Sequence, residues 1–117
     1  MPHLTLNTTI DFEDAKVEEI LVTFTKAISK LLGKPEKFVM VQVNKGQKMS
    51  FGGSTDPCAV IRLVSIGGLD DKDKNNEIVA DLSQIVVELG VSADRCFVEL
   101  ANAERHQYGF NGKTFAQ

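Results

Sequence analysis

Polar and apolar side chains alternate at the start of the chain. The spacing of the apolar positions then changes to that of a helix. The alternation over residues 3–9 predicts a strand. Apolar residues then recur at spacings of three and four, which predicts an amphipathic helix with Asp11 as N-cap and Gly33 as stop signal. The apolar positions of this helix are Val17, Ile20, Leu21, Phe24, Ile28 and Leu31. A second strand is predicted over residues 39–43.

The same order of elements returns in the second half of the chain. A strand is predicted over residues 58–65, followed by loop residues and a helix that ends at Gly90. The apolar positions of this helix are Ile78, Leu82, Ile85 and Leu89. A fourth strand is predicted over residues 96–100, before a tail rich in glycine and aromatic residues.

This repetition predicts a duplicated βαβ fold. A shift of 57 residues superimposes the strand, helix and strand of one half on those of the other. The units span about residues 2–45 and 58–101, a short tail spans residues 102–117, and residues 1–117 form a single domain of the α/β (α+β) class. Because βαβ crossovers are right-handed, we expect a four-stranded mixed sheet with both helices on one face.

Two of the predicted strands are apolar on both sides. The strand from Cys58 to Val64 is interrupted only by Arg62, and the strand from Cys96 to Leu100 only by Glu99. Strands of this kind are normally covered on both faces, whereas two helices cover one. We therefore expect a large apolar patch on the uncovered face, and an obligate oligomer that buries it.

Composition and charge exclude several classes of protein. The chain of 117 residues is 43% hydrophobic and 25% charged, as in a globular domain. Its formal charge of −3, without a cluster of Lys and Arg, argues against a nucleic-acid partner. Its apolar runs are too short for a membrane span, and no signal-peptide pattern is visible. The expected location is cytoplasmic.

Few side chains offer familiar catalytic chemistry. The histidines and cysteines form no cluster with metal-ligand spacing, so no metal or other cofactor is expected. Cys58 and Cys96 are expected to be reduced and to pack as small hydrophobic residues. Pro2 follows the initiator methionine, which methionine aminopeptidase removes before small residues. An N-terminal proline amine whose pKa is lowered by an apolar pocket suits a general base, although Met-Pro is also an ordinary start of a chain.

Short motifs are distributed along the chain from Met1 to Ala116. They are Met1-Pro2 with Asn7-Thr8, Gly33-Lys34-Pro35, Phe51-Gly52-Gly53-Ser54, Asp56-Pro57-Cys58-Ala59, Ser65-Ile66-Gly67 and Gly109-Phe110-Asn111-Gly112-Lys113-Thr114-Phe115. In this order and spacing, the chain resembles the macrophage migration inhibitory factor family of the tautomerase superfamily, which includes D-dopachrome tautomerase.

The resemblance implies an assembly, an activity and a set of site residues. The family's duplicated βαβ fold forms a homotrimeric barrel, and its active sites lie between subunits. These sites isomerise small aromatic keto and enol substrates such as phenylpyruvate and dopachrome. By resemblance Pro2 is the catalytic base, and Lys34 contacts the anionic or carbonyl oxygen of the substrate. The other implied substrate-binding residues are Ile66, Phe97, Glu99, Phe110 and Phe115.

The chain departs from the best-studied members at three positions. Phe97 and Glu99 stand where those members carry Tyr and Asn. Phe97 removes a hydroxyl from the pocket, and Glu99 adds a carboxylate that should raise the pKa of the Pro2 amine and repel a carboxylate substrate. We therefore expect weaker or shifted tautomerase activity. Ile61 replaces the second cysteine of a Cys-x-x-Cys motif, so thiol–disulfide activity is not expected.

The resemblance also implies a signalling role. Family members act as cytokine-like proteins that engage the invariant-chain receptor, and they leave cells by a non-classical route, so an extracellular location is implied beside the cytoplasmic one. Three functions stay open at this point: a tautomerase, a signalling ligand, and a structural trimer with weak or vestigial tautomerase activity. The first two are compatible with each other.

Overall fold

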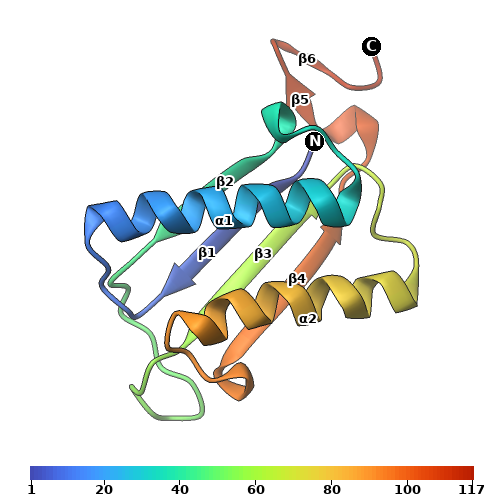
Figure 1. Cartoon of the computed structure of the whole chain (residues 1–117). Helices are drawn as coiled ribbons and strands as arrows, with labels where there is room; N and C mark the ends of the chain where they lie inside the picture. Colours follow the sequence, from blue (N-terminus) through green and yellow to red (C-terminus); the bar gives the residue numbers. More distant parts are fainter.

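Four strands form one mixed sheet in the order β2-β1-β3-β4. In this computed structural model, which describes all 117 residues, the strands are β1 (His3–Thr8), β2 (Met40–Asn44), β3 (Ala59–Ser65) and β4 (Cys96–Asn102). Figure 1 shows that both helices, α1 (Asp14–Leu32) and α2 (Lys72–Glu88), lie on one face of this sheet. The remaining elements are η1 (Glu36–Phe38), η2 (Ala93–Arg95), η3 (Arg105–Gln107), β5 (Gly109–Phe110) and β6 (Lys113–Thr114).

The strand pairing follows the internal repeat. β1 pairs in parallel with β2, and β3 pairs in parallel with β4, so each βαβ unit makes one parallel pair. β1 and β3 pair antiparallel and join the two units into one sheet. The short helices η1 and η2 precede β2 and β4 at equivalent places. The predicted fold, with duplicated βαβ units and two helices on one face of a mixed sheet, is confirmed.

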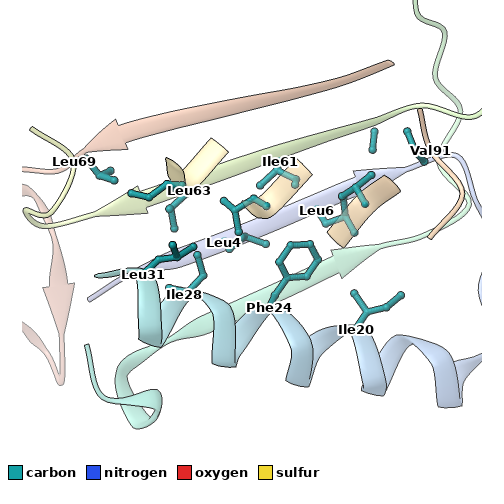
Figure 2. Close-up of a cluster of buried hydrophobic side chains, with 14 residues drawn as sticks. Leu4, Leu6, Ile20, Phe24, Ile28, Leu31, Ile61, Leu63, Leu69 and Val91 are labelled. Carbon is teal, nitrogen blue, oxygen red and sulfur yellow. The ribbon is translucent and has the colours of Figure 1, made fainter. Parts of the chain in front are cut away.

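The hydrophobic core lies between the helices and the sheet. Phe24 is wholly buried and points from α1 toward the sheet, where Leu4 and Leu6 of β1 meet it (Figure 2). Ile78 and Leu82 of α2 belong to the same buried cluster, and α2 packs against β4. Neither helix combines the length and the apolar character that crossing a bilayer requires.

The predicted N-cap of the first helix is wrong. α1 begins at Asp14, three residues after Asp11, because the preceding segment is held in an extended conformation by the turn after β2. The Gly46 amide donates to the Ile10 carbonyl at 2.9 Å, and the Lys45 ammonium lies 3.7 Å from the Asp11 carboxylate. These contacts between distant parts of the chain outweigh the local capping preference of Asp11.

The sheet face opposite the helices is not covered by the chain. Its side chains include His3, Thr5, Asn7, Met40, Gln42, Asn44, Val60, Arg62, Val64, Phe97, Glu99 and Ala101. The expected large apolar patch is wrong, because β1 and β2 contribute mainly polar residues, and the Arg62 guanidinium lies 2.9 Å from the Glu99 carboxylate. Met40 and Phe97 are the large apolar exceptions, exposed to 63% and 66%.

Both cysteines are free thiols. Cys58 is buried and Cys96 is half-buried at the start of β4. Burial and the neighbouring Cys58 raise the pKa of the Cys96 thiol, so it keeps its proton at neutral pH. No group of three or more His, Cys, Asp or Glu side chains is placed to hold a metal ion.

Candidate active site

The start of β1 lies at the end of the sheet that also carries the C-terminal hairpin (Figure 1). Pro2 is buried there, and its carbonyl accepts a hydrogen bond from the Met40 amide at 3.0 Å. This bond extends the parallel pairing of β1 and β2 and fixes the position of Pro2. A cavity of about 210 Å³ adjoins it and is lined by Met1, Pro2, Lys37, Phe38, Val39, Met40, Tyr108, Gly109 and Phe110.

A second cavity of about 230 Å³ contains Lys34. Its lining is Met1, Lys34, Pro35, Phe38, Ile66, Arg105 and Phe115. Met1 and Phe38 line both cavities, so the two spaces meet at these side chains. The pair of cavities brings together Pro2, Lys34, Ile66, Phe110 and Phe115 from four separate segments of the chain.

The end of α1 places Lys34 beside the N-terminus. Gly33 adopts a left-handed conformation with φ of 64°, as glycine does readily at a helix C-terminus. The Lys34 amide donates to the Ser29 carbonyl at 3.1 Å, which turns the chain away from the helix axis. The positive charge of Lys34 acts on the Met1 amine, whose pKa is lowered by burial and by this charge.

The tail is a hairpin that carries the aromatic side of the site. The Phe115 amide donates to the Tyr108 carbonyl at 3.1 Å, and the Arg105 guanidinium donates to the Phe115 carbonyl at 2.7 Å. The Phe110 ring lies edge-on to Phe38, with ring centres 6.2 Å apart, and stacks on Phe115 at 6.1 Å. These contacts tie the two aromatic residues predicted from sequence to the Pro2 end of the sheet.

The charges around the two cavities have one sign. Lys37 lines the first cavity, Lys34 and Arg105 line the second, and no carboxylate lines either. Cations of this kind attract an anionic ligand and favour the neutral form of a nearby amine. The arrangement therefore suits a small aromatic acid bound beside a neutral amine.

Phe97 and Glu99 do not join this site within one chain. Phe97 is in register with Val60, which pairs with Asn7 at the far end of β1. Glu99 lies two residues further along β4 on the open face, paired with Arg62. Figure 1 shows the start of β4 at the end of the sheet opposite the N-terminus.

Sequence reasoning missed several residues that line the cavities, among them Arg105, Tyr108 and Phe38. Arg105 and Tyr108 belong to the tail, and their positions depend on how the hairpin folds back on the sheet. Phe38 lies in η1 and is shared by both cavities. The available signal was the concentration of aromatic residues in the tail, where Tyr108, the only tyrosine, stands two positions before Phe110.

Comparison with known proteins places this geometry in a family. Residues 1–116 match the family model described as Macrophage migration inhibitory factor. The chain belongs to this family. It is 38% identical to a macrophage migration inhibitory factor homolog of Brugia malayi over 115 residues, which is 98% of this chain and 99% of that protein.

Solved structures of the macrophage migration inhibitory factor family have the same fold. The homologue from Prochlorococcus marinus has a TM-score of 0.91 at 29% identity, covering 97% of this chain and 98% of that one. The protein from Toxoplasma gondii has a TM-score of 0.88 at 34% identity, covering 97% and 99%. Membership supports, in general terms, isomerase-type tautomerase activity and a cytokine-like role, in a family whose structures are typically oligomeric.

Proposed function

We propose that this protein, once Met1 is removed, is a keto–enol tautomerase that uses the Pro2 amine as its general base. Its substrates are aromatic keto acids and related compounds of the phenylpyruvate or dopachrome type. The observation that carries the proposal is a buried Pro2 beside an aromatic cavity with cations, to which the same chain contributes no carboxylate. Membership in a family of tautomerases supports the class of reaction.

Removal of Met1 changes the chemistry of the Pro2 nitrogen. In the full chain this nitrogen is an amide without a basic lone pair, and after removal it is a secondary amine. The pKa of the half-buried Met1 amine is already lowered by burial and by Lys34. Removal of Met1 leaves the Pro2 amine at the same end of the sheet, where we expect burial and the charge of Lys34 to lower its pKa as well. A neutral amine near pH 7 can take a proton from the carbon beside the substrate carbonyl.

Cationic side chains stabilise the charge that this proton transfer creates. As the C–H proton moves to the Pro2 amine, negative charge develops on the carbonyl oxygen of the substrate. The substrate also carries a carboxylate, which Lys34 and Arg105 of the adjoining cavity can bind. Preorganised donors and charges around the developing enolate lower the barrier to reaction.

We also propose a homotrimer in which Phe97 and Glu99 of one subunit complete the cavity at Pro2 of another. Phe97 is 66% exposed on the open face, and β2 and β4 are edge strands of the sheet. Unpaired edges of this kind readily bind another chain. A solution mass of about three times 12.8 kDa supports the trimer, and a 12.8 kDa monomer excludes it.

The conversion of enol-phenylpyruvate to its keto form tests the proposed activity. The sample is first shown by intact mass to lack Met1, and the loss of enol absorbance is then followed. We expect an initial rate above the buffer rate that increases in proportion to protein concentration. A rate equal to that of buffer at every protein concentration rules the activity out.

We expect Glu99→Asn to increase kcat/KM for phenylpyruvate about fivefold. The substitution removes a negative charge from the vicinity of a carboxylate substrate, which is worth about 1 kcal/mol at a solvated site, and it leaves Arg62 without its partner. Glu18→Gln, an exposed charge change on α1, is the matched control and should leave kcat/KM unchanged. An unchanged or lower rate for Glu99→Asn contradicts this role.

A further inference from the structure

Tyr108 lies at the cavity of Pro2 and has a hydrogen-bond donor that no other group of the protein uses. The residue lines the same cavity as Pro2 and is half-buried. The tail holds it in place, because its carbonyl accepts from the Phe115 amide at 3.1 Å and the two ring centres are 6.0 Å apart. The Tyr108 hydroxyl forms no hydrogen bond within the protein, and its oxygen is accessible to solvent. It is therefore available to a ligand.

We propose that Tyr108 donates a hydrogen bond to the substrate oxygen that gains negative charge during the reaction. This inference rests on the proposed tautomerase function and adds a catalytic residue to it. The carbonyl of phenylpyruvate is bonded to the carbon that gives its proton to Pro2, whereas the carboxylate lies one bond further away. Tyr108 shares the cavity of Pro2, and Lys34 and Arg105 lie in the adjoining one. The carbonyl oxygen therefore faces Tyr108, and the carboxylate faces the two cations.

The chemistry of the phenol suits this task. Burial raises the pKa of Tyr108, so the hydroxyl keeps its proton at neutral and mildly alkaline pH. The phenol keeps its own proton throughout: the proton from carbon goes to the Pro2 amine and then from this amine to the enolate oxygen, which gives the enol and restores the base. The charge of Lys37 in the same cavity adds to the stabilisation of the developing enolate. Tyr108 thus supplies a hydroxyl in a chain that has a phenylalanine at position 97.

The Tyr108→Phe substitution tests this role kinetically, because it removes the hydroxyl and keeps the ring against Phe115. We expect kcat for phenylpyruvate to fall about 10- to 100-fold while KM changes less than about threefold, as for a donor that acts mainly in the transition state. Thr114→Val removes a neighbouring tail hydroxyl outside both cavities and should leave kcat unchanged. An unchanged kcat in Tyr108→Phe, or a loss confined to KM, overturns the inference.

A spectroscopic titration tests the contact without turnover. The chain has one tyrosine and no tryptophan, so the absorbance of ionising phenolate reports Tyr108 alone. Benzoylformate is an aromatic keto acid without a removable proton beside its carbonyl, and it therefore binds without reacting. We expect millimolar benzoylformate to raise the pKa of Tyr108, because its oxygen accepts a hydrogen bond from the neutral phenol. An unchanged or lower pKa overturns the inference.

The two experiments separate this inference from the proposed function. If the unmodified protein and Tyr108→Phe convert phenylpyruvate equally fast, the tautomerase function stands and the role of Tyr108 is wrong. If the unmodified protein has no activity, the proposed function is wrong, and the benzoylformate titration still decides whether Tyr108 binds the keto acid.

Discussion

Protein with an acylated Pro2 nitrogen is expected to convert phenylpyruvate at least about 100-fold more slowly than protein that begins at Pro2. A positioned general base raises the rate of a proton-transfer reaction by about 10²- to 10⁴-fold, and an amide nitrogen cannot act as a base. Met1 also lines both cavities, so its side chain occupies space where they meet. Acylation therefore removes the base and also obstructs the substrate.

A chain with one alanine inserted between Met1 and Pro2 provides the blocked form. Its Pro2 nitrogen is an amide whether or not methionine is removed, and intact mass identifies each species. Thermal unfolding at equal protein concentration checks that both forms keep the fold. Equal turnover by the blocked form and the form beginning at Pro2 is incompatible with Pro2 as the base.

Replacement of Phe24 by alanine is expected to lower the free energy of unfolding by about 3–5 kcal/mol. Phe24 is wholly buried between α1 and the sheet, at the centre of the cluster in Figure 2. The substitution leaves a cavity that helix and strands cannot close without moving. Urea unfolding at matched protein concentrations measures the change, because the stability of an oligomer depends on concentration.

Val22→Ala is the control for this core substitution. Val22 lies on the same helix and is 53% exposed, so its truncation should change the free energy of unfolding by less than about 1 kcal/mol. A similar loss for both variants would contradict a specific role for the burial of Phe24, because alanine has a higher helix propensity than either replaced residue.

Local patterns predicted the elements of this fold but not all of their surroundings. The helical period marked Phe24 and Ile28, which the structure buries, because an amphipathic helix must face its apolar side to a core. Asp11 was misjudged because the contact between Gly46 and Ile10 is not local. The polar character of the open face was missed because it is set by neighbouring strands, and Thr5 lies beside Arg62 only once the sheet has formed.

The residues of the candidate site also differ in whether they could be predicted from the sequence. Pro2 and Lys34 were predicted from the family resemblance, which rests in part on the motifs Met1-Pro2 and Gly33-Lys34-Pro35. Tyr108 and Arg105 were not, because their place depends on the course of the tail hairpin. Phe97 lies far from Pro2 in a single chain, and its proposed role depends on a second subunit.

The central claim is that a neutral Pro2 amine is the base, and the pH dependence of kcat/KM for phenylpyruvate tests it most directly. The amine is active only without its proton, so the rate should rise with pH through the amine pKa and then level off. Burial and the charge of Lys34 lower the pKa of the Met1 amine below its ordinary value of 8.0, and we expect the same surroundings to lower the pKa of the Pro2 amine. We predict half-maximal kcat/KM below pH 8 for protein that begins at Pro2. A midpoint at or above pH 8, or a rate that falls as pH rises through this range, would contradict the account.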